Sequence, residues 1–243
     1  MEQHISHLDS ERFGFPVARI NEFQKPVLLV LERFQGLGVR LVISRVPADQ
    51  IQLLNEMEQA GFRLKDIQVT YNYDLQRPLP RAAKDGYSYR AFRSNDREDI
   101  EAIAAQAFQD YGHYSKLDVL SEVKTGDIYA DWARRCCLEP AMAEQIIVAD
   151  TGTEVAGFLA FRTQEEEDGP RYTAGVMGAV GARHRRTGVF QNINILGLHW
   201  AQEQGFLRVE HNVLITNPAV NKTYTSLGFH LIRSEVTMHC LLV

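Results

Sequence analysis

The segment from residue 175 to residue 200 constrains the fold of this chain more than any other. A glycine-rich run with the pattern of a strand, 175–181, leads into the basic turn Arg183-His184-Arg185-Arg186. Apolar residues then recur at helical spacing from Val189 to Trp200, which predicts a helix beginning near Gly188. Backbone N–H groups at a helix start have no partner within the helix and lie at the positive end of its dipole. Because the whole chain carries a net charge of −5, this basic turn predicts an anion site, and specifically a pyrophosphate site.

The order of residues in this turn differs from the better-known phosphate loops. The chain has no G-x-x-x-x-G-K-[ST], and no G-x-G-x-x-G that follows a strand near the start of a βαβ unit. The arrangement Arg185-x-x-Gly188-x-Phe190 instead resembles the acyl-CoA loop [QR]-x-x-G-x-[GA] of the GCN5-related N-acetyltransferase (GNAT) superfamily, with Phe190 at a position that is usually small. An ordinary basic helix start is the alternative explanation. The resemblance implies an acetyl-CoA site at Ala179, Val180, Arg185, Arg186, Thr187, Gly188, Val189 and Phe190.

A second motif lies further along the chain. The pattern over 209–215 predicts a strand, and Asn217-Pro218 supplies a helix start with Asn as N-cap and Pro at the first helical position. Asn217, Asn221 and Tyr224 then fall on one face of that helix. The superfamily motif N-x-x-A-x-x-x-Y-x-x-x-G-F is similar to this stretch, which reads Asn217-x-x-Val220-x-x-x-Tyr224-x-x-x-Gly228-Phe229 with Val in place of Ala as the single change.

The resemblance implies how the reaction would run. Strand residues 178–180 would splay from the next strand and offer free N–H groups to a thioester, and Tyr224 would be the general acid that protonates the leaving thiolate. Asn217 and Asn221 would also line the acetyl-CoA site, while packing on a helix face is the alternative role for Tyr224.

The general base is left open. Glu210 and His211 point to opposite faces of their strand, so at most one of them is expected to reach the cleft. His113 is a third candidate. Together with Tyr114, these three are the predicted substrate-binding residues.

The chain is predicted to divide at a linker over 76–86, which holds two prolines, several charges and no periodicity. Before the linker, strands over 39–45 and 64–73 flank a helix over 49–60, which predicts a small N-terminal α/β module of residues 1–80. This module has no motif that carries chemistry. Docking of a partner and help in walling the acceptor site are both left open as its role.

Residues 86–243 are expected to form the acetyltransferase domain, so the predicted fold class is α/β (α+β) with a mixed sheet. The order of the predicted elements matches the superfamily along its whole length: strand 87–93, helices 96–108 and 127–137, strands 145–149, 155–162 and 171–180, a helix from 189, strand 209–215, a helix from 217, and strands 230–233 and 236–242.

A narrower resemblance extends over nearly the full chain. The opening segment 8–20 resembles the start of TDP-fucosamine acetyltransferases, which carry a D-S-x-F-F-G-type sequence there and also place an α/β module before the acetyltransferase domain. Residues 108–118 lie where those enzymes have an F-H-x-D-P-type substrate segment, although Asp118 is displaced and no proline follows it. Those enzymes acetylate the 4-amino group of a TDP-linked deoxyaminosugar.

Composition excludes several other classes of protein. The chain has no apolar run long enough for a transmembrane helix and no N-terminal signal peptide, and its three cysteines form no disulfide framework, so a cytoplasmic protein without a membrane partner is expected. No Cys, His or carboxylate spacing resembles a metal site. A pI near 5.9 without a basic face argues against nucleic acid as a partner.

These observations lead to one leading function and two alternatives. The leading expectation is an N-acetyltransferase that moves the acetyl group of acetyl-CoA, by direct attack in a ternary complex, to a primary amine of a small molecule such as a nucleotide-linked aminosugar. A protein or peptide N-acetyltransferase has the same chemistry with a different acceptor. A non-catalytic acyl-CoA-binding regulatory protein belongs to another class. A homodimer is left open.

Overall fold

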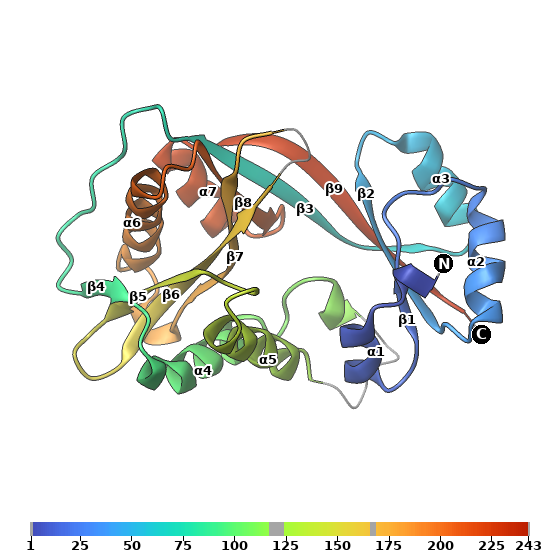
Figure 1. The fold of residues 1–243 in the computed structure, drawn as a ribbon, viewed down its shortest axis with the longest axis horizontal. Coiled ribbons are helices and arrows are strands. Elements are labelled where there is room, and N and C mark those ends of the chain that lie inside the picture. Colours follow the sequence, from blue (N-terminus) through green and yellow to red (C-terminus); the bar gives the residue numbers. More distant parts are fainter. Residues whose placement is uncertain (1, 117–123, 166–168, 243) are drawn as a thin grey trace.

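The computed structural model describes residues 2–116, 124–165 and 169–242. Within them one mixed sheet of nine strands runs through the molecule, in the order β1-β2-β9-β3-β8-β7-β6-β5-β4 (Figure 1). The strands are β1 (Val17–Arg19), β2 (Leu41–Pro47), β3 (Arg63–Asp74), β4 (Ser88–Ala91), β5 (Gln145–Asp150), β6 (Val155–Gln164), β7 (Tyr172–Val180), β8 (Arg208–Leu214) and β9 (His230–Leu241).

Seven α-helices pack on this sheet within the same residues. They are α1 (His7–Phe13), α2 (Val27–Gly36), α3 (Ile51–Gln59), α4 (Arg97–Ala107), α5 (Thr125–Leu138), α6 (Val189–Glu203) and α7 (Pro218–Leu227). Short 3-10 turns include η3 (His113–Lys116) before α5 and η5 (Ala182–His184) before α6. None of the helices in the described ranges combines the length and apolar character that crossing a bilayer requires.

The predicted mixed α/β fold is confirmed, and most predicted elements are present with shifted ends. One prediction at the C-terminus is wrong. The two strands expected over 230–233 and 236–242 form the single strand β9, because Ser234 and Glu235 continue the pairing with β3 instead of turning the chain. Helix α2 and strand β1 were not predicted. Asp118, which belongs to the predicted substrate segment, lies outside the described residues, as do residues 166–168 between the strands predicted over 155–162 and 171–180.

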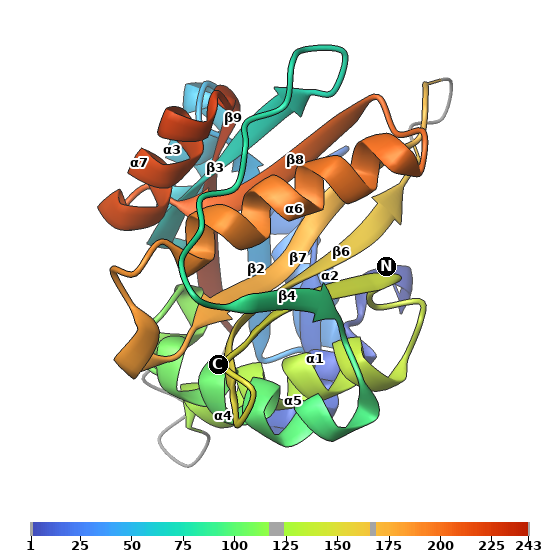
Figure 2. The same ribbon diagram turned by 90° about the vertical axis from the view of Figure 1, so that its left-hand side faces the viewer.

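The C-terminal part of the sheet is covered on both faces (Figure 2). Alternate residues of β6 explain why: Phe158 and Ala160 join the core beneath α4 and α5, whereas Leu159 and Phe161 join the core beneath α6. Gly197 lets α6 approach closely, since a Cβ there would lie 2.2 Å from the Phe161 ring.

The N-terminal part of the sheet has its own apolar layer. Helices α2 and α3 bury Phe34 and Met57 against Val42 of β2 and Met238 of β9. The opposite face of the same strands points toward α1, α5 and η3, and there Leu41 and Ile43 join the core of the C-terminal part. The two parts therefore share packing as well as a sheet.

Strand β3 joins the two parts most directly. It precedes the predicted linker, yet it lies between β8 and β9 and pairs antiparallel with both. Its second half, 68–74, pairs with β8, and its first half pairs with the part of β9 that also contacts β2. The stretch predicted as a linker is the connection from β3 to β4, and the strands on its two sides belong to one sheet.

Candidate functional site

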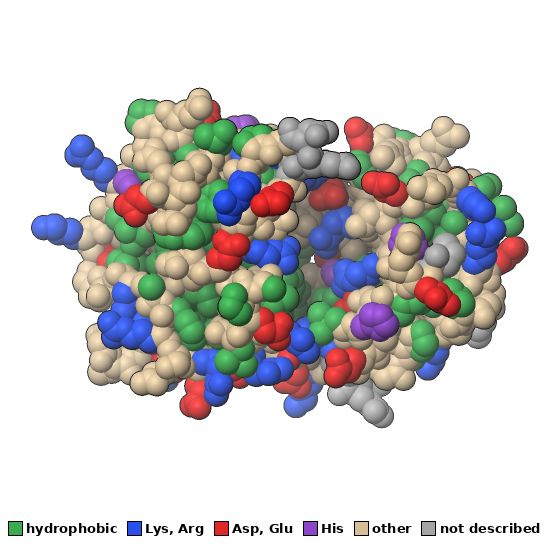
Figure 3. All heavy atoms as spheres, viewed as in Figure 1, with side chains coloured by type: hydrophobic (Ala, Val, Ile, Leu, Met, Phe, Trp, Pro, Cys, Tyr) green, Lys and Arg blue, Asp and Glu red, His purple; other side chains and the backbone are tan. Residues whose placement is uncertain are grey.

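A cleft of about 390 Å³ lies where the two parts of the molecule meet. The space-filling view shows the surface hollowed there, with basic side chains among those on its walls (Figure 3). Strands β7 and β8 border the cleft from one part and β1, β2 and β3 from the other, while residues 108–114 and α5 close a further side.

Strands β7 and β8 separate at the floor of this cleft. They pair in parallel only from Thr173 with Val209 to Gly175 with His211. Val176 is an extra residue in the pairing of β7 with β6, because Ala160 is opposite Met177 and Phe161 is opposite Gly175, and such a bulge bends the strand. Beyond this point β8 does not pair with β7, so the predicted splay of residues 178–180 is present.

Gly175 is required where the strands part. A Cβ on Gly175 would lie 2.2 Å from Nδ1 of His211, so only glycine lets the imidazole pack against β7. The His211 ring in turn stacks on Tyr224, with centroids 4.9 Å apart and an interplanar angle of 8°. The same contact that ends the strand pairing thus fixes the position of Tyr224.

The basic turn has the geometry of an open helix start. Residues Arg185, Arg186, Thr187 and Gly188 are exposed, and no side chain caps α6. The first hydrogen bond of the helix runs from the Asn192 N–H to the Gly188 carbonyl, so the N–H groups of 189–191 precede the helix ladder. Arg186 and Gly188 both have positive φ angles, 67° and 91°, which turn the backbone at this point.

His184 does not take part in this open helix start. Its Nε2 lies 3.0 Å from Glu154 Oε1 and its Nδ1 lies 3.1 Å from the Tyr87 hydroxyl. It therefore ties the turn to the β5–β6 hairpin and to the segment before β4, and the exposed cations are Arg183, Arg185 and Arg186.

The two asparagines of the second motif hold the start of α7. Asn217 accepts a hydrogen bond from the Val220 N–H, as expected of an N-cap, and also borders the cleft. The Asn221 amide donates to the carbonyls of Leu214 (2.9 Å) and Asn217 (2.6 Å). Asn221 thus locks α7 onto the end of β8, and its contacts within the chain are structural.

Tyr224 points from α7 toward the cleft and is buried among four rings, those of Tyr71, Phe190, His211 and Phe229. Burial raises the pKa of its phenol well above 10, so the hydroxyl stays protonated near neutral pH. No residue in the described ranges hydrogen-bonds this hydroxyl. Phe190, the departure from the family loop, packs its ring 6.0 Å from that of Tyr224.

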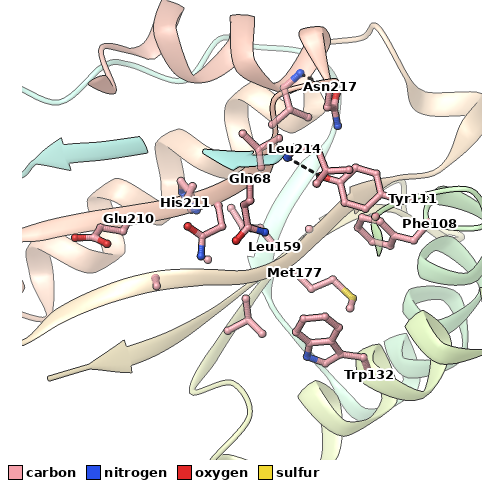
Figure 4. A pocket seen from close by; sticks show the side chains of 18 of the residues that line it. Gln68, Phe108, Tyr111, Trp132, Leu159, Met177, Glu210, His211, Leu214 and Asn217 are labelled. Atoms are coloured by element: carbon pink, nitrogen blue, oxygen red, sulfur yellow. Dashed lines mark hydrogen bonds between the residues drawn. The ribbon is translucent and has the colours of Figure 1, made fainter. Parts of the chain in front are cut away.

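A second phenol, Tyr111, was not predicted. Its hydroxyl accepts a hydrogen bond from the Leu214 N–H at 3.2 Å, at the end of β8 (Figure 4, dashed). Tyr111 and Phe108 stand on one side of the pocket, and His211 and Glu210 on the other.

The predicted substrate residues His113 and Tyr114 both border the cleft but are engaged within the protein. His113 Nδ1 lies 2.9 Å from Nε2 of His239, and burial lowers the pKa of His113 well below 6.5. The Tyr114 hydroxyl donates to buried Asp9 at 2.9 Å and accepts from Arg19, and burial raises its pKa to about 12. At neutral pH His113 is therefore uncharged and the Tyr114 hydroxyl stays protonated.

Glu210 and His211 both border the cleft, although at most one was expected to reach it. The cleft opens between β7 and β8 within the plane of the sheet, so residues on either face of β8 meet it. Glu210 pairs with Arg208 (2.9 Å) and Arg233 (3.7 Å), and burial lowers the pKa of His211 to about 3.

The N-terminal part supplies site residues that sequence reasoning missed. They come from β1, β2 and β3 and are all polar or charged: Arg19, Arg45, Asp66 and Gln68. Of the two roles left open for this region, the structure supports that of a wall of the cleft. The sequence of β3 alternates between Ile67, Val69, Tyr71 and Tyr73 on one face and polar residues from Asp66 to Asp74 on the other, and this alternation does not distinguish Asp66 and Gln68 from an ordinary polar face.

Comparisons with known proteins agree with this geometry. A model of the acetyltransferase (GNAT) family matches residues 100–229, which is more than half of the chain. The chain belongs to this family. No curated protein matches it significantly. In the described ranges no group of three or more His, Cys, Asp or Glu side chains could hold a metal ion.

Several solved structures share the fold at low sequence identity. A tandem GNAT protein from the clavulanic acid biosynthesis pathway is 15% identical, with a TM-score of 0.63 over 94% of this chain and 76% of that one. A GNAT protein from Kribbella flavida is 16% identical, with a TM-score of 0.62 over 93% and 81% of the two chains. A GNAT protein from Sphaerobacter thermophilus is 17% identical, with a TM-score of 0.58; the match covers 83% of this chain but only 59% of that protein.

Proposed function

We propose that this protein is an acetyl-CoA-dependent N-acetyltransferase that acts on a primary amine of a small molecule. The observation that carries the proposal is the combination of the open α6 start with the β7–β8 splay, two features that would meet the pyrophosphate and the thioester at the two ends of the pantetheine arm of an acyl-CoA. Backbone N–H groups and the exposed arginines 185 and 186 would bind the pyrophosphate. The unpaired edge of β7 would bind the pantetheine arm and the thioester.

The reaction requires the amine nitrogen to attack the thioester carbonyl, so that a C–N bond forms and the C–S bond breaks. The nitrogen gives up one proton, and the leaving sulfur receives one to become the CoA thiol. N–H groups of β7 past Gly175 would stabilise the oxyanion, an interaction generally worth about 3 kcal/mol. Tyr224 would donate the proton to sulfur, since burial keeps its phenol protonated.

The walls that β3 and residues 108–114 give the cleft favour a small acceptor over an extended peptide. The resemblance of segment 8–20 to TDP-fucosamine acetyltransferases makes TDP-linked aminosugars the first acceptors to test. Asp9 and Ser10 of that segment support the cleft wall, with Asp9 bound to Tyr114 and Ser10 Oγ accepting from the Val17 N–H.

The test is release of CoA thiol from acetyl-CoA in a panel of TDP-aminosugars, polyamines, aminoglycosides and peptides. The expected result is thiol release with a small amine, with stoichiometric acetylated product by mass spectrometry. Tight CoA binding without turnover on any amine would instead indicate the regulatory acyl-CoA-binding protein.

A further inference from the structure

Asp66 of β3 borders the cleft, and neither of its carboxylate oxygens has a hydrogen-bond partner among the residues that the structure describes. Both oxygens are shielded from solvent, and the Gly112 turn lies over them, since a Cβ on Gly112 would be 3.8 Å from Oδ2. A shielded carboxylate without a donor or a cation is unfavourable. Such a group at the edge of a cavity is explained by a ligand that supplies the missing donors.

Gln68 extends the same face of β3 toward the reaction centre. Its Oε1 is also buried without a partner, and its backbone is paired opposite Leu214, the residue of β8 whose N–H contacts Tyr111. Asp66 and Gln68 thus offer hydrogen-bond acceptors along a path that ends beside the splayed strands. An ammonium group, with three donors and a positive charge, is complementary to this pair.

Arg45 places a positive charge on the same face of the sheet, level with Asp66 across the strands. Thr237 of β9 is paired with Arg45 of β2 on one side and with Asp66 on the other, so the three side chains leave the same face. Two strand spacings of about 4.8 Å separate Arg45 from Asp66. The Arg45 Nε donates to Thr237 Oγ1 at 3.1 Å.

The Arg45 guanidinium has no carboxylate partner in the described part of the chain, although it is half-buried and borders the cleft. Its neighbour Arg19, by contrast, is paired with Asp9 at 2.5 Å. The Arg45 guanidinium is therefore free to bind an anionic group of a ligand, such as a carboxylate or a phosphate.

We propose that the acetyl acceptor carries both an amine and an anionic group, with Asp66 and Gln68 binding the amine group beside the thioester and Arg45 binding the anion. The amine binds as the ammonium and loses one proton to solvent before its nitrogen attacks. This inference rests on the proposed acetyltransferase function. It assigns substrate selection to the N-terminal strands, while the family motifs in the C-terminal part bind acetyl-CoA. Polycationic amines are disfavoured because they would place a positive charge near Arg45.

The experiment measures binding of matched amines to the CoA-loaded protein by calorimetry, and thiol release with the same compounds. Glucosamine 6-phosphate is compared with glucosamine, and lysine with cadaverine, so that each pair shares an amine and differs by a phosphate or a carboxylate. The variants are Arg45→Gln and Asp66→Asn. Arg63→Gln is the control, since Arg63 is exposed on the same strand as Asp66 and lies outside the cleft.

In the wild-type protein, at least one amine with an anionic group should bind roughly 10-fold or more tightly than its matched partner without that group. Arg45→Gln should remove that preference, and Asp66→Asn should weaken both members of the pair while CoA affinity stays within about 2-fold. The pair that shows the preference identifies the anion as phosphate or carboxylate. Arg63→Gln should behave as wild type.

Equal binding within both pairs, or a preference that persists in Arg45→Gln, overturns the inference. The proposed function fails in a different way, by absence of thiol release with amines that do bind. Because binding and turnover are read separately, the two failures are distinguishable.

Discussion

Replacing Tyr224 by Phe tests the proton donor of the proposed reaction with little disturbance of the fold. The four ring contacts of Tyr224 are retained in the variant, and its hydroxyl has no hydrogen bond to lose in the described structure. The free energy of unfolding should therefore change by less than about 1 kcal/mol. Tyr224→Ala, which leaves a cavity among those rings, should cost about 3–5 kcal/mol.

Turnover should fall by about 100-fold in Tyr224→Phe, the usual minimum for a positioned general acid, which corresponds to about 2.7 kcal/mol in the activation free energy. Since burial raises the pKa of Tyr224 above 10, the deficit should be the same across neutral pH. The dissociation constant of CoA should stay within about 2-fold of wild type. The assay is thiol release at saturating acetyl-CoA and acceptor, with calorimetry for CoA.

Tyr73→Phe is the matched control. Tyr73 is a buried tyrosine outside the cleft whose hydroxyl donates to the Pro78 carbonyl at 2.8 Å, so its loss should lower stability by about 1 kcal/mol and leave turnover unchanged. Full turnover in Tyr224→Phe together with a large loss in Tyr111→Phe would refute the assignment and transfer the role to Tyr111.

Three further outcomes are expected. The double variant Arg185→Ala, Arg186→Ala should bind CoA about 10-fold or more weakly than wild type at low salt, with a smaller difference at high salt. An unchanged CoA affinity by calorimetry would exclude the turn as the pyrophosphate site. Gly175→Ala should lower the free energy of unfolding by about 1–3 kcal/mol, seen as a lower melting temperature, because the new methyl group overlaps His211. Gly181→Ala is the control and should change stability little, because the nearest atom to its Cβ would be 3.5 Å away. His113, His211 and His239 have lowered pKa values in the folded protein, so below pH 6.5 the unfolded chain binds more protons than the folded one. Their contribution to the free energy of unfolding should be fully present above pH 6.5. It should fall on acidification toward pH 3, by about 1.4 kcal/mol per pH unit for each histidine that stays neutral in the folded state. A denaturant midpoint that does not change between pH 7 and pH 5 would contradict this.

The sequence was sufficient to predict the C-terminal elements because each carries a local signal. The helix start at Asn217 is specified by capping chemistry and the one at Gly188 by apolar periodicity, and both helices begin within a residue of the predicted positions. Fold class followed from the order of those elements.

The pairing of β3 with β8 and β9 could not be predicted in the same way. Strand pairing is decided by contacts between residues far apart in the sequence, and the 76–86 stretch has every local property of a linker between separate domains. The residues that the N-terminal strands contribute to the cleft were missed for the same reason. Asp66 and Arg45 line the cleft only through the central position of β3 and β9 in the sheet.

That central position has a consequence for how the protein is made. Strand β3 leaves the ribosome early, with unpaired edges on both sides, and its neighbours β8 and β9 are synthesised much later. Both chain ends lie in the same half of the molecule (Figure 1), and the last strand is interior to the sheet. Until β8 and β9 have been synthesised, both edges of β3 therefore lack the strands that pair with them in the folded protein. Deletion of β9 would remove a strand from the middle of the sheet, so it should abolish folding of both halves together.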